Sequence, residues 1–227
     1  MKKIIKIVIW ILGISLILYV GFISIGFYVY HRLHGEATGA YDKAYSEYVE
    51  NGDIIFQTSK SNQSKAIQLA TGSKYSHMGI IYENEGEFFV YEAVQPVKLT
   101  PLNDWISRGK KRHYVIKRLE NADQVLTNST LIKMKEIGEQ FKGKPYDIYF
   151  EWSDEKIYCS ELVWKIYKQA TNIEIGQLEQ LSDFDLSNEI VKATMKERYG
   201  SDIPMDEKVI SPAAMFNSEK LITIEEK

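Results

Sequence analysis

The feature that most constrains this chain is an uncharged apolar run near its N-terminus. Residues 1–6 include three lysines, and residues 7–30 then continue for 24 positions without a charged side chain, dominated by Ile, Leu, Val, Phe and Tyr. A helix of ~20 such residues is long enough to span a bilayer. We therefore expect residues 1–35 to form an N-terminal transmembrane helix.

The flanks of this run predict its fate and its orientation. It is longer than the ~7–15 residues of a signal-peptide core, and no small-x-small cleavage site closes it, which favours an uncleaved signal anchor. Lys2, Lys3 and Lys6 precede the run, whereas Arg32 is the one Lys or Arg close behind it. The positive-inside rule then predicts a cytoplasmic N-terminus and a single pass, with the large C-terminal part outside the cytoplasm.

The rest of the chain divides into a linker and one domain. Residues 36–51 are polar with tyrosines at helical spacing, and they predict a linker helix. Residues 52–227 have the length of one globular domain with a sizeable core.

The charge of the domain bears on its partners. Without residues 1–35 the chain carries 24 basic and 31 acidic residues, a net charge of −7. This acidity argues against nucleic-acid binding as the main role. We interpret the short basic cluster Arg108, Lys110, Lys111 and Arg112 as a solvated loop and not as a phosphate site.

Apolar periodicity and turn residues predict helices and strands in a mixed order. The sequence predicts strands at 54–57, 77–82, 87–94 and 114–119, with helices at 64–70, at 129–141 and from Cys159 onward. A helix, several strands and then helices indicate the α+β class.

Cys159 is the only cysteine and the expected first residue of its helix. The apolar residues Leu162, Val163 and Ile166 continue one buried face behind it. Unpaired N–H groups and the helix dipole at such an end favour a thiolate and offer donors to an oxyanion. A free cysteine is also among the most buried residue types, so a purely structural role stays open.

Two further residues are placed to support a thiol nucleophile. His77 opens one strand and Glu92 lies in the next, so a hairpin that turns at Asn84 and Glu85 makes them direct cross-strand neighbours. The carboxylate then holds the imidazole in one tautomer. From spacing alone, His77 as a satisfied strand-end residue and Glu92 as an exposed strand acid remain alternatives.

Several motifs carry a family resemblance. Gly52-Asp53-Ile54-Ile55-Phe56, Ser76-His77-Met78-Gly79-Ile80, Tyr91-Glu92-Ala93, Gly143-Lys144-Pro145-Tyr146-Asp147, Tyr158-Cys159-Ser160-Glu161-Leu162-Val163 and Ile210-Ser211-Pro212-Ala213-Ala214-Met215-Phe216 follow one another in this order. Over about residues 51–218 the chain resembles the permuted papain-like amidases of the YiiX/YaeF type, bacterial relatives of NlpC-type cell-wall peptidases.

The resemblance implies a circularly permuted papain-like (NlpC-type) fold, with an antiparallel sheet packed on helices. It also implies that Cys159 is the nucleophile, His77 the general base and Glu92 the orienting third member. Tyr146 is a candidate for an oxyanion or substrate contact, with packing in a turn as the alternative. His113 matches no motif position, and we expect it to be structural.

The sequence predicts neither cofactor nor metal. It contains no Gly-rich phosphate loop and no zinc-ligand pattern. Asp183 and Asp185 are near-paired carboxylates, but no third ligand stands at suitable spacing, so a helix cap is the preferred interpretation.

These observations predict a membrane-tethered, extracytoplasmic cysteine hydrolase that cleaves an amide bond in a cell-wall peptide or related compound. A lipid or lipoprotein thioesterase or acyltransferase is the alternative, and a non-catalytic peptide- or lipid-binding module is the third hypothesis. The expected partners are a peptide or acyl substrate and the membrane, without nucleic acid. The bond, the oligomeric state and the role of residues 178–204 stay open at this stage.

Overall fold

The computed structural model describes Tyr19, residues 21–26 and residues 47–227. The chain divides into two compact units, Met1–Ala44 and Tyr45–Lys227. In the first unit Tyr19 and residues 21–26 are helical, and the rest of the expected membrane span, like most of the expected linker, lies outside the described residues. Among the residues described, no helix combines the length and the apolar character needed to cross a bilayer.

The second unit is built on one antiparallel sheet of six strands. They lie in the order β4-β3-β2-β1-β5-β8, and each pairs antiparallel with its neighbours. The bounds are β1 Ile54–Gln57, β2 His77–Asn84, β3 Glu87–Glu92, β4 Lys98–Pro101, β5 Tyr114–Leu119 and β8 Leu221–Glu226. This antiparallel sheet confirms the α+β prediction.

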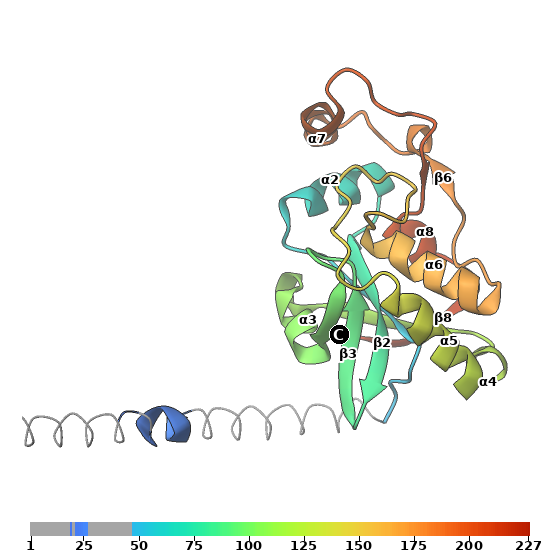
Figure 1. The fold of residues 1–227 in the computed structure, drawn as a ribbon. Helices are drawn as coiled ribbons and strands as arrows, with labels where there is room; N and C mark the ends of the chain where they lie inside the picture. Colours follow the sequence, from blue (N-terminus) through green and yellow to red (C-terminus); the bar gives the residue numbers. More distant parts are fainter. Residues whose placement is uncertain (1–18, 20, 27–46) are drawn as a thin grey trace, which may run out of the picture. The chain divides into compact units, whose positions relative to one another are not determined.

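Successive side chains of the central strands point to opposite faces of the sheet and pack in two different hydrophobic cores. Ile54 and Ile80 belong to the larger core, whereas Ile55 and Ile81 belong to the smaller one on the opposite face. Figure 1 shows α3 (Leu102–Arg108) on one side of the sheet, and α5 (Asn128–Glu139) and α6 (Cys159–Thr171) on the other. Helices therefore cover both faces, because the central strands β1, β2 and β5 have buried residues on both sides.

The remaining elements surround this framework. Helix α2 (Asn62–Thr71) packs against α7 (Glu189–Tyr199), which belongs to a long excursion after α6. The shorter elements are η1 Lys110–Arg112, α4 Ala122–Val125, β6 Glu179–Gln180, η2 Leu181–Asp183, β7 Lys208–Val209 and α8 Pro212–Phe216.

Most of the predicted elements are confirmed. Strands β1 and β5 have the predicted bounds, and α6 begins at Cys159 as expected. Helix α2 ends where predicted because Gly72 adopts a left-handed conformation, with φ 64°. Strands β4 and β8 were not predicted, since their short runs carry many exposed side chains and so lack a buried pattern.

The predicted register of the β2–β3 hairpin is wrong. Ile80 pairs with Tyr91 and Asn84 with Glu87, so the turn is formed by Glu85 and Gly86. Both turn residues have positive φ, 55° and 84°, as a two-residue type I′ turn requires. Glu92 therefore falls beside Gly79, diagonal to His77 and on the same face of the sheet.

Gly79 makes this diagonal contact sterically feasible. A Cβ built on Gly79 would lie 2.4 Å from Val90 Cγ1 and 3.4 Å from Glu92 Cβ. A side chain at this position would therefore compete with Val90 and Glu92 for the same space. Its absence leaves Glu92 room to extend along the sheet toward His77.

Candidate active site

Helix α6 presents Cys159 at its first turn. Cys159 is buried, with 2% of its surface exposed, and Ser160 Oγ donates 2.7 Å to the carbonyl of Ile210. Glu161 accepts from the backbone N–H of Tyr158 at 3.4 Å and forms an ion pair with Lys165 at 2.8 Å. These contacts anchor the helix start and hold the thiol in a fixed place.

His77 lies at the start of β2 and is bound to Glu92. The distance from His77 Nε2 to Glu92 Oε2 is 2.6 Å, and the Glu92 side chain is completely buried. Thr100 Oγ1 donates to Glu92 Oε1 at 2.6 Å, and the guanidinium of Arg108 donates to the same oxygen. Trp105 stacks on the His77 ring, with centroids 5.8 Å apart. Stacking on Trp105 therefore fixes the orientation of the imidazole plane, and the hydrogen bond to Glu92 fixes the position of Nε2.

The protonation states of the pair follow from these contacts. Burial alone would lower the pKa of His77, but hydrogen bonds with Cys159 and Glu92 outweigh it and raise the pKa to about 9. Burial alone would raise the pKa of Glu92, but His77, Thr100 and Arg108 outweigh it and lower the pKa to about 2. At neutral pH the pair is an imidazolium and a carboxylate.

The structure thus brings Cys159, His77 and Glu92 together in one row. The thiol lies within hydrogen-bonding reach of the imidazole, whose Nε2 is bonded to Glu92, so Nδ1 is the nitrogen left to interact with the sulfur. An imidazolium beside a cysteine stabilises the thiolate, which is the nucleophilic form. This arrangement can carry out acyl transfer through a thioester.

Tyr146 lies beside this row and is not a solvent-facing turn residue. Its hydroxyl accepts 2.8 Å from Gln63 Nε2, and Gln63 Oε1 accepts 2.8 Å from Arg198. Burial, together with the charge of Cys159, raises the pKa of Tyr146 well above its usual range. The hydroxyl keeps its proton, and because it accepts from Gln63 that proton is free for another partner.

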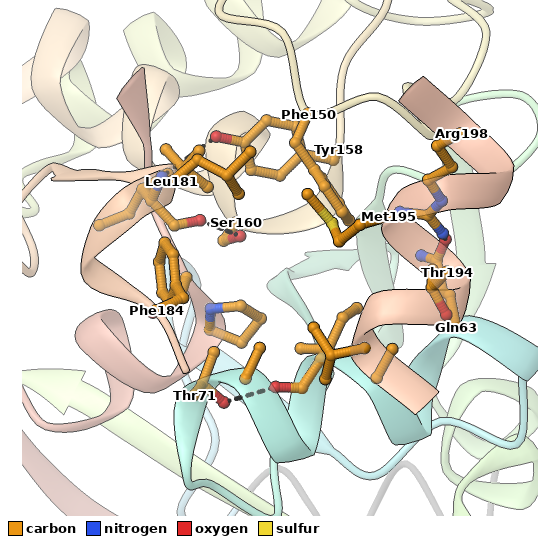
Figure 2. Close-up of a pocket in the computed structure, with 18 of the residues that line it drawn as sticks. Gln63, Thr71, Phe150, Tyr158, Ser160, Leu181, Phe184, Thr194, Met195 and Arg198 are labelled. Atoms are coloured by element: carbon orange, nitrogen blue, oxygen red, sulfur yellow. Dashed lines mark hydrogen bonds between the residues drawn. The ribbon is translucent and has the colours of Figure 1, made fainter. Parts of the chain in front are cut away.

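An apolar cavity opens on the Cys159 side of the site. Its walls come from α2, α6, α7, η2 and the segment before α8, and Phe150, Tyr158, Leu181 and Met195 line it in Figure 2. Gln63 and Arg198 lie together on one wall, joined by their hydrogen bond (Figure 2). Much of the wall comes from residues 178–204, so this excursion encloses the Cys159 side of the site.

A comparison with protein families identifies the chain. Residues 48–225 match the family model of the permuted papain-like amidase enzymes YaeF/YiiX, family C92. The chain belongs to this family. Its members are papain-like cysteine amidases, so the fold and the general activity expected from the motifs are confirmed.

Two relatives of this C92 chain lie close in sequence and structure. The chain is 47% identical over 175 residues to protein YiiX of Escherichia coli K12, covering 77% of this chain and 85% of YiiX. The crystal structure of YiiX from Escherichia coli O157:H7, described as a metalloprotein, superposes with a TM-score of 0.75 at 47% identity. That match covers 78% of this chain and 97% of the crystallised chain.

The metal in that description has no evident ligand set in this C92 chain. Among the residues described here, no group of three or more His, Cys, Asp or Glu side chains is placed to hold a metal ion. Asp183 accepts from the N–H of Gln180 at 2.7 Å, which caps η2, and Asp185 accepts from Ser187.

The sequence-based interpretation missed three residues of this C92 site. Arg108 was assigned to a solvated loop, but its guanidinium binds buried Glu92. Thr100 and Trp105 have no distinguishing pattern, although an aromatic residue one turn before a basic residue on a short helix is a weak signal. His113 stacks on Tyr75 with centroids 6.3 Å apart and does not line the apolar cavity.

Proposed function

We propose that this C92 protein hydrolyses an amide through a thioester on Cys159, with His77 as general acid and base and Glu92 as the orienting residue. The single observation that supports the proposal is the hydrogen-bonded row from Cys159 through His77 to Glu92. A buried carboxylate with three side-chain donors keeps its charge, and it holds the imidazolium where the thiolate needs it.

The reaction proceeds in two balanced steps. The Cys159 thiolate attacks the carbonyl carbon, the C–S bond forms, and the C–N bond breaks as His77 gives its proton to the departing amine. Neutral His77 then takes a proton from water, and the hydroxide attacks the thioester and releases a carboxylic acid and the thiolate. His77 is then protonated again, as at the start of the cycle, and the carboxylic acid gives its own proton to solvent as the product leaves.

Two donors are available for the oxyanion of the tetrahedral intermediates. The backbone N–H of Cys159 points out of the first turn of α6, and one such donor commonly contributes ~3 kcal/mol. The protonated hydroxyl of Tyr146 is the second donor. Gln63 donates a hydrogen bond to the oxygen of this hydroxyl, so the hydroxyl proton stays available for the oxyanion. We assign Tyr146 to the oxyanion or to substrate binding.

A specific observation favours a second candidate function. The cavity on the Cys159 side has almost entirely apolar walls. An acyl chain of a lipid or lipoprotein suits such walls, which favours a thioesterase or acyltransferase that uses the same thioester. A cell-wall peptide would place polar groups against them.

Membrane attachment and location belong to the proposal as well. The uncharged run at residues 7–30 and the preceding lysines support a single-pass anchor with the catalytic unit outside the cytoplasm. Labelling of a cysteine introduced near residue 36 in intact cells tests this, with a Cys159→Ala background. Protection of that cysteine from an impermeant reagent would contradict the orientation.

The decisive experiment compares the full-length protein with Cys159→Ser and His77→Ala on peptidoglycan fragments, N-acyl amides and acyl thioesters. We expect kcat/KM on the true substrate class to fall by about 10³-fold or more in Cys159→Ser. Intact-mass analysis should detect the acyl group on wild-type Cys159. Full turnover by Cys159→Ser would overturn the assignment, and alkylation of Cys159 that is unaffected by His77→Ala would indicate a binding module.

A further inference from the structure

A second hollow lies on the His77 side of the same site. Its empty volume is about 1520 Å³, and its lining includes His77 but not Cys159, whereas the apolar cavity is lined by Cys159 but not His77. Gln63 and Tyr146 line both. We call this second space the leaving-group hollow, for the reason given next.

The proposed reaction assigns each hollow a role. The departing amine must receive its proton from His77, so it lies on the His77 side. The acyl part remains bonded to Cys159 and occupies the apolar cavity. The scissile carbonyl then lies between the two, at Tyr146 and Gln63, which border both spaces.

The leaving-group hollow is lined mainly by polar side chains and carries positive charge. Two cationic residues line it besides His77, namely Lys60 and Arg108, and no acidic residue is found among its described lining residues. Serines and glutamines make up most of the rest. The carboxylate that pairs with Arg108 and His77 is Glu92, which is completely buried behind them and does not line the hollow.

Lys60 lines this hollow from a different segment of the chain than Arg108. It lies in the loop between β1 and α2, and its ammonium donates 3.4 Å to the carbonyl of Ser107, next to Arg108 at the end of α3. The two cations therefore stand on neighbouring positions of the rim. Ser61, which also lines the hollow, begins α2 without a side-chain cap, and the first turn contains no acid.

We propose that the leaving group carries an anionic group, a carboxylate or a phosphate, which binds in the leaving-group hollow at Lys60 and Arg108. The substrate is then an amide with an apolar acyl part and an acidic amine part. This inference rests on the proposed function, because His77 defines the leaving-group side. It also gives Arg108 a second task, since its guanidinium has further N–H donors beyond the one on Glu92.

The first test needs no substrate and uses the full-length protein. Iodoacetate and iodoacetamide alkylate Cys159 with the same leaving iodide, but only iodoacetate is an anion. We expect Lys60→Gln to lower the iodoacetate-to-iodoacetamide rate ratio by about three- to tenfold, a typical effect of one nearby charge. The matched control is Lys65→Gln, an exposed lysine of α2 that lines neither hollow, and it should leave the ratio unchanged.

The second test uses amides with one acyl chain and different amines. N-dodecanoyl glycine and N-dodecanoyl phosphoethanolamine are anionic, and N-dodecanoyl ethanolamine is neutral. We expect kcat/KM to favour one anionic amide over the neutral one, and Lys60→Gln to reduce that preference by about three- to tenfold. The two anionic amides distinguish carboxylate from phosphate.

The outcomes separate this inference from the proposed function. Cys159-dependent turnover without any preference for anionic amides overturns the anion site and leaves the amidase intact. An alkylation ratio that Lys60→Gln does not change overturns it as well, even when no amide is hydrolysed. If no substrate class shows turnover that depends on Cys159, the proposed function is overturned. The alkylation rate ratio still tests, independently, whether Lys60 attracts an anion to the leaving-group hollow.

Discussion

Within the described part of the chain two glutamates are completely buried, Glu92 and Glu161, and they differ in charge. Glu92 lies on the hairpin beside His77, and Glu161 lies on α6 two residues after Cys159. Burial opposes ionisation at both. The pKa of Glu92 is nevertheless lowered to about 2, whereas burial raises the pKa of Glu161 to about 8, despite Lys165.

The number of donors explains the difference. Glu92 accepts from His77, Thr100 and Arg108, two of which are cationic. Glu161 has the ion pair with Lys165 and a long 3.4 Å contact with the N–H of Tyr158. A buried carboxylate therefore stays charged only where several donors surround it, and in this protein that place is behind the imidazole.

The largest expected effect tests which glutamate serves the reaction. Glu92→Gln should lower kcat/KM by about 100-fold, because the imidazolium loses its anionic partner. Glu161→Gln is the matched control, since it removes the other buried carboxylate and should change kcat/KM less than about threefold. Steady-state kinetics on one amide would measure both, and equal losses would contradict the distinction.

The second prediction concerns the pH dependence of stability. The folded pKa of Glu161 is above the unfolded value of about 4.5, so the folded state binds its proton more tightly and loses stability as pH rises from 4.5 toward 8. We expect this loss to approach about 1 kcal/mol per pH unit. Urea unfolding of wild type and Glu161→Gln between pH 5 and pH 8 would detect it. Parallel curves would show that Glu161 is ionised in the folded state.

The third prediction tests the geometry behind Glu92. Gly79→Ala would place a methyl group 2.4 Å from Val90 Cγ1 and 2.7 Å from the carbonyl of Tyr91, so the strands must shift. We expect a loss of about 1–3 kcal/mol in unfolding free energy and about tenfold in kcat/KM. Ile81→Val, two residues further on the same face, controls for stability alone. If both variants lose the same amount of kcat/KM for each kcal/mol lost in unfolding free energy, Gly79 has no special role in the site.

The smallest expected effect is a shift of the alkaline limb of activity. His77 must hold its proton for the leaving group, so kcat/KM should fall as pH rises through about 9 in wild type. Glu92→Gln removes the negative charge of Glu92 and weakens its hydrogen bond to His77, both of which raise the pKa of His77. The alkaline limb of the remaining activity should therefore move down by about one pH unit. A limb that stays at its wild-type pH would assign it to another group.

Part of the site was predictable because it depends on local pattern. The position of Cys159 at a helix start follows from apolar spacing within one element, and β1, β5 and α6 have their predicted bounds. The pairing of His77 with Glu92 was also predicted, but through a wrong register. The turn at Glu85 and Gly86 moves Glu92 two residues along β2, from His77 to Gly79, and the missing side chain of Gly79 permits the diagonal bond.

Arg108 and the excursion at residues 178–204 could not be placed in this way. A basic cluster in a polar segment has the same composition whether it is solvated or points at a buried carboxylate. The apolar residues of the excursion could pack among themselves or line a cavity, since periodicity does not say which partner lies opposite.

By itself the sequence determined the family, the α+β order and the residue types of the row Cys159, His77 and Glu92, because motifs and periodicity are local. Only the tertiary structure decided the charge of each buried glutamate, the part played by Arg108 and the division of the site into an apolar cavity and a polar hollow. The physical reason is that ionisation and enclosure depend on the sum of neighbours from distant segments, and that sum exists only after folding.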